Sequence, residues 1–316
     1  MRRLSLRCTG GAVVALGTGA ACSHPLASPP ATVLPWHWSF EPWVLVCLAL
    51  SLGLYLVGLA RLWRHAGSGR GVARTSALAF MVGWAGLVLA LVSPLDGWGG
   101  SLFSAHMLQH ELLMVVVAPL LVMGRPLGVW AWGLPPAARR GAAAALHHPL
   151  WRRPWRVLSS VLAAWLLHAA VLWAWHWPFF FEAALHSNTV HSWQHISFLF
   201  SALLFWWTAL GRPARGIEGP ALLSLFTTML HTSALGALLT LSPLVWYPHY
   251  LQAAAAVGWD ALEDQQLGGL VMWVPAGLSY LIAGLAMAQR WIGRHPDGTS
   301  PWADRPPPVA SGSRSQ

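Results

Sequence analysis

The chain alternates long apolar runs with short polar segments. Seven runs are long enough to cross a bilayer, because a helix rises ~1.5 Å per residue and the hydrocarbon core is ~30 Å thick. They cover approximately residues 43–60, 75–92, 104–123, 157–177, 191–210, 221–241 and 267–288. This pattern predicts an all-α polytopic membrane protein, a bundle of seven transmembrane helices within residues 35–292.

The composition agrees with a membrane protein. Of 316 residues, 56% are hydrophobic and only 9% are charged, against about 25% charged in a soluble domain. The net charge of +9 comes from arginines alone, since the chain has no lysine. These arginines cluster between apolar runs, as topology signals do, so the charge does not indicate a nucleic-acid partner. The partner of the apolar faces is the lipid membrane.

Arginine placement predicts the orientation. Arginines occupy alternate connections and the tail, and the other three connections between runs have none. The positive-inside rule then places the N-terminus outside and the C-terminus in the cytoplasm. The arginines that follow the first, third, fifth and seventh runs are Arg61, Arg64, Arg70, Arg74; Arg125, Arg139, Arg140, Arg152, Arg153, Arg156; Arg212, Arg215; and Arg290, Arg294, Arg305, Arg314.

Both ends of the chain differ from this bundle. Residues 1–22 have a basic start, a short apolar stretch and small residues, which predicts a signal peptide and a multi-pass protein of the bacterial plasma (inner) membrane. An uncleaved anchor that adds an eighth crossing is the alternative. Residues 293–316 are rich in Pro, Ser and Gly and predict a disordered cytoplasmic tail. The three cysteines form no CxxC or CxxCH motif, which argues against cysteine zinc sites and covalent haem.

Histidines gather at one predicted end of the bundle. His106 and His110 open the third run, and His191 and His195 open the fifth. Each pair has the i,i+4 spacing that places two side chains on one helix face. His176 closes the fourth run at the same predicted depth. Imidazole suits copper, zinc and iron, so these five histidines predict a metal site near the outer leaflet. A histidine at a helix end can equally be an interfacial residue.

Other polar side chains in the runs are candidates to support such a site. A carboxylate inside a membrane helix is a functional candidate, which singles out Glu111, and Met114 lies four residues beyond His110. Asp264 opens the seventh run at the same end, and Gln109 and Met272 are the remaining supporting candidates. His168 and His231 lie deeper and either form an inner polar track or are core residues bonded to a carbonyl.

Four segments resemble a known family: HMLQHELLMVVVAPLLVMGRPL (106–127), WAWHWPFFFEAALHSNTVHSWQH (173–195), FWW (205–207) and DQQLGGLVMW (264–273). They are similar to the CtaG family of cytochrome c oxidase assembly factors, seven-helix membrane proteins linked to caa-type haem-copper oxidases. The resemblance covers about residues 35–292. It departs from the family at Phe180 and Phe181, where Tyr and Asp are commoner. The family pattern falls on His106, Gln109, His110, Trp175, His176, Pro178, His191, His195, Asp264, Gln265, Gly268, Gly269, Met272 and Trp273.

The resemblance implies an assembly factor that is not an enzyme and that binds cytochrome c oxidase subunits. We therefore expect a chaperone that handles copper through His106, His110, His191 and His195, with His176 as an alternative ligand. Asp264 would orient a ligand imidazole and Glu111 would balance charge. A b-type haem electron carrier, a scaffold that needs no metal, and a copper or proton transporter are the alternatives.

Overall fold

The computed structural model describes residue 34 and residues 36–211 and 218–293. Every regular element within these residues is a helix, which confirms the all-α class. The predicted signal peptide and nearly all of the predicted tail lie outside the described residues, as do Arg212, Arg215, Arg294, Arg305 and Arg314.

The helices follow one another with short connections. In chain order they are α1 (Pro42–Ala66), α2 (Arg74–Leu91), α3 (Pro94–Gly99), α4 (Phe103–Glu111), the π-helix η1 (Leu112–Val117), α5 (Ala118–Met123), α6 (Pro126–Gly133), α7 (Pro136–His147), α8 (Pro149–Leu158), α9 (Val161–His176), α10 (Pro178–His186), α11 (Asn188–Leu210), α12 (Glu218–Leu241), α13 (His249–Ala256) and α14 (Ala261–Ile292).

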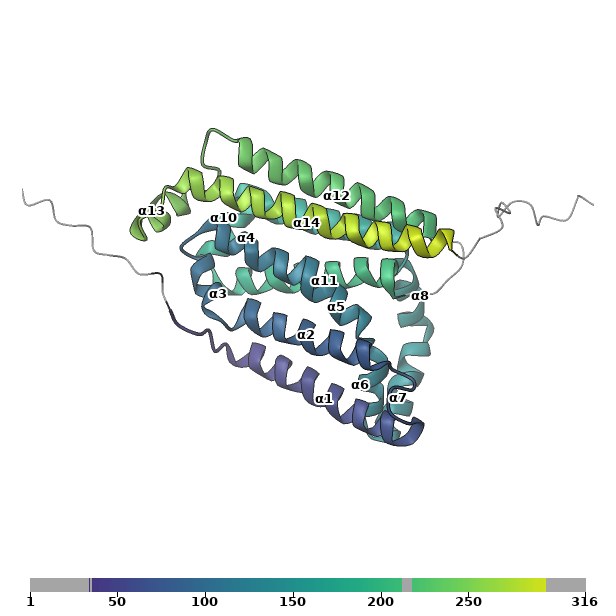
Figure 1. Ribbon diagram of the computed structural model, residues 1–316. Helices are drawn as coiled ribbons and strands as arrows, with labels where there is room; N and C mark the ends of the chain where they lie inside the picture. Colours follow the sequence, from purple (N-terminus) through teal and green to yellow (C-terminus); the bar gives the residue numbers. More distant parts are fainter. Residues whose placement is uncertain (1–33, 35, 212–217, 294–316) are drawn as a thin grey trace, which may run out of the picture.

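The long helices lie along one common direction. Figure 1 shows α12 and α14 side by side on one face of the bundle and α1 with α2 on the opposite face. The continuous stretch α4–η1–α5 and α11 lie between these two faces. The most extensive helix contacts are those of α12 with α14, α4 with α14, α1 with α6, and α11 with α9. The middle of the bundle is thus built from α4–η1–α5 and α11.

Each of the seven predicted runs lies in a helical part of the chain, but the structure of the described residues supports fewer than seven crossings by length and composition. Five segments are long and apolar enough to cross a membrane: α1, α2, Phe103–Met123, α12 and α14. α8 and α9 together could form a sixth, although they are bent by 70°. α11 is 23 residues long, but its first turns, NTVHSWQH, are polar. Seven crossings and their orientation stay a prediction.

The fourth run differs from the expected single helix over 157–177. It breaks at Ser159 and Ser160, and α9 starts only at Val161. Ser160 caps α9, because its hydroxyl accepts a hydrogen bond from the Ala163 amide at 3.3 Å. A capping serine satisfies an amide that the first helical turn leaves unpaired, and so favours a new helix start at this point.

The third run is irregular in its middle. The helix widens to π geometry over Leu112–Val117 and returns to α geometry at Ala118. Pro119 has no amide hydrogen for the carbonyl four residues earlier, and its ring crowds that turn. A π-turn inserts one extra residue and often occurs at functional sites. Here it follows directly after the two histidines of α4.

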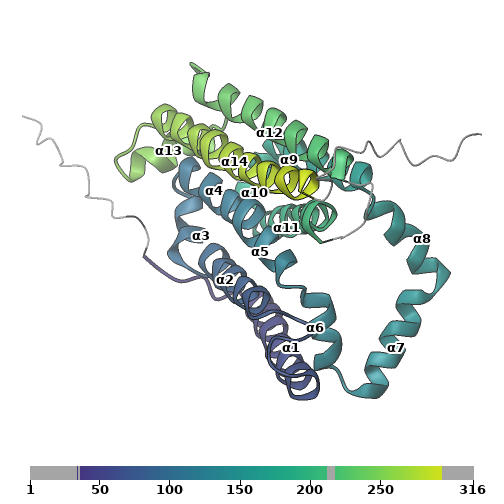
Figure 2. The same cartoon turned by 45° about the vertical axis from the view of Figure 1, so that its right-hand side comes forward.

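The described arginines lie at one end of the bundle, where α1 ends and α2 begins, next to α6, α7 and α8 (Figure 2). Arg61 donates a hydrogen bond to the Gly133 carbonyl at 2.8 Å, and the Arg139 guanidinium lies 4.5 Å from the centroid of the Trp132 ring. The opposite end carries α3, α10 and α13. We call these the arginine end and the α3–α10–α13 end.

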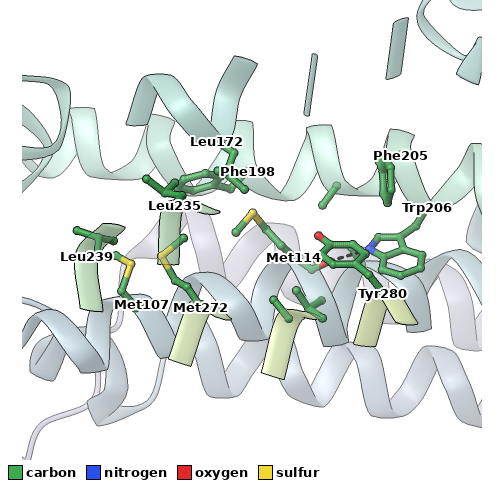
Figure 3. Packing of buried hydrophobic residues seen from close by; sticks show 14 of the residues in the cluster. Met107, Met114, Leu172, Phe198, Phe205, Trp206, Leu235, Leu239, Met272 and Tyr280 are labelled. Carbon is green, nitrogen blue, oxygen red and sulfur yellow. Dashed lines mark hydrogen bonds between the residues drawn. The ribbon is translucent and has the colours of Figure 1, made fainter. Parts of the chain in front are cut away.

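Two apolar clusters hold the bundle together. One joins α4, α9, α11, α12 and α14, and Figure 3 shows part of it around Met107, Met272 and Leu239. The other joins α1, α2 and α6 to the inner side of η1 and α5. Glycines allow α12 and α14 to pack closely: a Cβ added at Gly269 of α14 would lie 2.7 Å from the Gly236 carbonyl oxygen of α12. Small residues of this kind let membrane helices approach closely.

We expect Gly269→Ala to destabilise the protein. Its methyl group would force α12 away from α14, and overpacking of this kind costs about 1–3 kcal/mol. Gly284→Ala on the same helix is the matched control, since an added Cβ there meets nothing within 4 Å. Thermal unfolding in detergent should show a lower midpoint for Gly269→Ala only. Equal midpoints for the two variants would contradict the close-contact role of Gly269.

Candidate metal centre

Three histidines form a cluster at the α3–α10–α13 end. One ring nitrogen of each of His106, His191 and His195 lies within 4.8 Å of the other two. His106 comes from α4, and His191 and His195 are successive-turn neighbours on α11 with ring centroids 4.2 Å apart. Imidazole nitrogens bonded to one ion at about 2 Å lie about 3.5 Å apart. Small side-chain rotations would therefore close this cluster around a metal ion.

His110 supplies a fourth imidazole. Its ring centroid lies 4.4 Å from that of His106 and 5.4 Å from that of His195. Both of its nitrogens are buried and have no hydrogen-bond partner among the described residues. The two predicted i,i+4 pairs are therefore brought together, because α11 packs against η1 and α5, which continue α4.

The protonation of His106 is fixed by its neighbours. Its Nδ1 atom lies 3.3 Å from the Gly99 carbonyl oxygen and 3.2 Å from the Tyr250 hydroxyl. Tyr250 donates its own hydrogen to the Gly99 carbonyl at 2.7 Å. A carbonyl only accepts, so the proton of the neutral ring must sit on Nδ1, and Nε2 presents its lone pair. A histidine held in this way through its other nitrogen is the usual metal-ligating arrangement.

The Tyr250 hydroxyl is neutral: it donates to the Gly99 carbonyl and accepts from His106 Nδ1. Tyr250 lies on α13, and burial raises the pKa of its hydroxyl well above the usual range, with Asp264 adding to the effect. Its ring packs edge-on against Phe103 of α4, with centroids 5.7 Å apart. The spacing of the sequence gave no signal for Tyr250, which lies 144 residues beyond His106.

His176 lies beside the cluster and not in it. Its Nδ1 is 2.7 Å from the Leu172 carbonyl oxygen, so this nitrogen donates, and its buried Nε2 has no partner within the described part of the chain. The ring contacts Phe198, with centroids 6.1 Å apart, and Phe198 in turn contacts His110 at 4.5 Å. His176 is thus next to the cluster with an aromatic ring as its neighbour.

The aromatic ring of Phe181 packs against the His106 ring of the cluster. Its centroid lies 5.0 Å from the His106 ring and 4.1 Å from the Tyr247 ring, and the side chain is fully buried. This is one of the two positions at which the sequence departs from the family pattern. The apolar Phe181 ring covers one side of His106 and keeps water from it. A polar side chain at this position would contact His106 instead.

Asp264 does not orient an imidazole as we expected. Its carboxylate accepts hydrogen bonds from the Phe103 amide at 2.6 Å and from the Ser104 amide and hydroxyl at 3.2 and 2.5 Å. It therefore caps the start of α4, where the helix leaves its first amides unpaired. Its effect on the cluster is indirect, through the position of the helix that carries His106 and His110.

The carboxylate that interacts with the cluster is Asp96, which the sequence did not single out. It interacts electrostatically with His191 and accepts a hydrogen bond from the Gln109 amide at 2.9 Å. Gln109 also donates to the Ala90 carbonyl at 2.7 Å. Gln109 thus ties α4 to α2 and α3 and does not point at an imidazole.

Glu111 and the methionines also differ from their expected roles. Glu111 is buried, and its Oε2 atom has no hydrogen-bond partner among the described residues, so the structure shows no hydrogen bond from this oxygen to an imidazole. Met114 and Met272 are buried in the apolar cluster that Figure 3 shows, near Leu235 and Phe198. Their packing is that of core residues.

His168 and His231 form a separate polar group in the middle of the bundle. The Ser201 hydroxyl donates to the Phe198 carbonyl at 3.1 Å and so accepts from His168 Nδ1, also at 3.1 Å. His168 lies two helical turns from His176, a rise of about 12 Å. His231 contacts Trp165, with centroids 6.3 Å apart. Leu172 and Phe198 occupy the region between this group and the cluster.

A groove reaches the cluster from one side. A cavity of about 620 Å³ is lined by His191 and His195 of α11, by Cys47 of α1, and at its rim by Glu41 and Asp96. His106 and His110 do not line it and are 1% exposed each. The cluster therefore has two deep and two accessible imidazoles.

Comparisons with known proteins agree with the family resemblance. The family model described as cytochrome c oxidase caa3 assembly factor (Caa3_CtaG) matches residues 53–294. Uncharacterized proteins of Mycobacterium bovis and Mycobacterium tuberculosis are each 29% identical over 282 residues, which cover 85% of this chain and 41% of each relative. One of Mycobacterium leprae is 25% identical over 283 residues, with the same coverage. The chain thus spans about two-fifths of the length of these relatives. No solved structure matches it.

We expect Tyr250→Phe to weaken metal binding at the cluster by roughly 10–100-fold, because His106 loses the group that helps to hold its tautomer and orientation. Tyr247→Phe is the matched control. Tyr247 lies just before α13, and this substitution removes a hydroxyl that donates to the His176 backbone carbonyl at 2.9 Å and not to an imidazole. Competition with a calibrated Cu(I) chelator measures both affinities. Equal affinities would show that Tyr250 does not position His106.

Proposed function

The chain belongs to the family of cytochrome c oxidase caa3 assembly factors, and on this premise we propose that it carries copper for the oxidase. The ion would be cargo, held by His106, His191 and His195 with His110 as a fourth ligand, and passed to an oxidase subunit. In this proposal the protein performs no chemical conversion.

The observation that carries the proposal is the unpaired lone pair of His106 Nε2. This atom is buried and has no hydrogen-bond partner in the described segments, and a buried polar atom without a partner costs about 1–3 kcal/mol. Two further imidazoles lie close enough to share an ion with it. A bound metal ion would satisfy all three nitrogens at once.

The donor set fits copper cargo. Imidazole nitrogen is a good ligand for copper, and the geometry of a site decides between metals more than raw affinity does. With His106, His191 and His195 bound, one coordination position stays available to His110 or to an incoming ligand, as in exchangeable sites, whereas structural sites are closed. His191 and His195 also line the groove. An incoming ligand could therefore replace these two first.

The position of the cluster supports delivery on the outer side. The described arginines lie at the opposite end of the bundle, and positive charge favours the cytoplasmic side. We accordingly propose seven crossings of the bacterial plasma membrane, with the α3–α10–α13 end outside. His191 and the acidic rim of Glu41 and Asp96 would then face the compartment from which copper arrives.

A b-type haem fits this geometry less well. Its axial ligands would be His110 and His195, whose ring centroids lie 5.4 Å apart. His106 lies 4.4 and 6.3 Å from these two rings, and His191 lies 4.2 Å from the His195 ring. The two imidazoles therefore occupy space on both sides that a porphyrin plane needs.

We expect His195→Ala to lose bound copper and to lower oxidase activity in cells. His186→Ala is the matched control, because His186 lies at the same end, is exposed, and has its Nδ1 on the Glu182 carbonyl at 2.7 Å. Metal content of the purified protein and oxidase activity of membranes are the two measurements. Copper content near one ion per chain in both variants would refute the cargo site. Loss of copper with normal oxidase activity would instead favour a scaffold that needs no metal.

A further inference from the structure

We propose that a groove between α1 and α11 receives a transmembrane helix of the oxidase subunit that accepts the copper, so that the ion leaves the cluster sideways within the membrane. This inference rests on the proposed function and names the partner surface. The acceptor helix would carry a metal-ligating side chain near its outer end.

The groove runs the length of the bundle. The cavity of about 620 Å³ at the cluster continues into a second cavity of about 300 Å³, because Ser51, Leu87, Leu199, Phe200 and Leu203 line both. Along α11 the lining extends from Asn188 to Trp207. Nineteen helical steps correspond to about 30 Å, the thickness of the hydrocarbon core. The groove is thus long enough for a membrane-spanning helix.

The two walls belong to different parts of the bundle. α1 packs mainly on α6, and α11 packs mainly on α9 and α5. In Figures 1 and 2, α2 and α5 lie between α1 and α11. The floor of the groove includes the buried residues Leu113 and Leu121, while Phe200 on the α11 wall is 48% exposed. A helix seated in the groove would cover this exposed face.

The cavity of about 300 Å³ is lined by apolar side chains of α2, α5, α6, α8 and α11, and by Ser51 alone from α1. The Trp84 indole donates to the Leu48 carbonyl at 3.1 Å, and the Trp130 indole donates to the Ser51 carbonyl at 2.8 Å, so both indole nitrogens are paired with carbonyls of α1. A surface of this kind suits a second apolar helix, because helices in lipid associate by close packing. A water-soluble domain would not enter it.

The position of the copper ligands determines what kind of helix would occupy the groove. His191 and His195 line the upper groove, whereas His106 and His110 are covered by protein. A group that takes the ion must therefore approach from the groove. A lipid chain could fill the apolar part but offers no ligand for copper. A transmembrane helix with an imidazole, thiolate or thioether at the level of His191 satisfies both requirements.

The test fills the groove without touching the cluster. Leu203→Trp places a large ring where the two cavities meet, and Leu223→Trp is the matched control on α12, where Leu223 is 62% exposed. We expect Leu203→Trp to keep its copper and to lower oxidase activity in cells by about tenfold, with no change for Leu223→Trp. Normal oxidase activity in a copper-loaded Leu203→Trp protein overturns the groove proposal and leaves the proposed function intact. A wild-type protein without copper contradicts the proposed function itself.

A second measurement decides the matter if Leu203→Trp does not fold. Cys47 is exposed and lines the groove, so a thiol-reactive photocrosslinker can be attached there in membranes, with Cys47→Ser as the control. The expected Cys47-dependent product joins this chain to a transmembrane peptide of an oxidase subunit, identified by mass spectrometry. Products with lipid alone, or with a second copy of this chain, overturn the proposal.

Discussion

Polar atoms inside this bundle need partners within the protein, because the surrounding hydrocarbon supplies no water. Some tryptophan indoles meet this need by donating to backbone carbonyls, as Trp206 does to Met114 at 2.8 Å. Other buried polar atoms have no partner among the described residues, including the indoles of Trp165 and Trp207 and several imidazoles. His106, His110 and His195 each keep a buried nitrogen without a partner in the described structure. The unpaired nitrogens of these three rings converge from two helices, and this convergence distinguishes the cluster from scattered core histidines.

The position of these rings depends on contacts from distant parts of the chain. Asp264 of α14 caps the start of α4, and Gln109 fastens the same helix to α2 and α3. Tyr250 of α13 reaches His106 itself. α4 is therefore held by four other helices: α14 at its first turn, α2 and α3 through Gln109, and α13 through His106. The π-turn that follows separates this fixed segment from the regular helix that leads to the arginine end.

The sequence predicted the helices and the histidine pairs well, because both follow from periodicity. Apolar runs become helices wherever they occur, and residues four apart share a helix face. The arginine pattern placed the histidine pairs of α4 and α11 at the same depth, and this predicted that the two pairs would meet. The sequence carried no comparable indication of which side chains from other helices would contact the histidines. Asp264 was correctly placed at the cluster's end of the bundle, but its bonds go to backbone amides, and Asp96 is the carboxylate that interacts with His191. Sequence spacing cannot distinguish these two outcomes, because both depend on how α14 and α3 pack against α4.

The four histidines of the cluster are buried to different extents, and this determines the side from which a bound ion would exchange. The deep pair, His106 and His110, is shielded by protein, and His106 is held through Nδ1 by a carbonyl and a hydroxyl. The α11 pair lines the groove, where an incoming ligand can compete. An ion bound by both pairs would exchange first on the accessible side, since those bonds can be replaced one at a time without exposing the deep nitrogens. The same asymmetry keeps the site closed toward the middle of the bundle, where Phe198 and Leu172 separate it from His168. The arrangement thus favours handing an ion to a neighbour in the membrane over moving it through the protein.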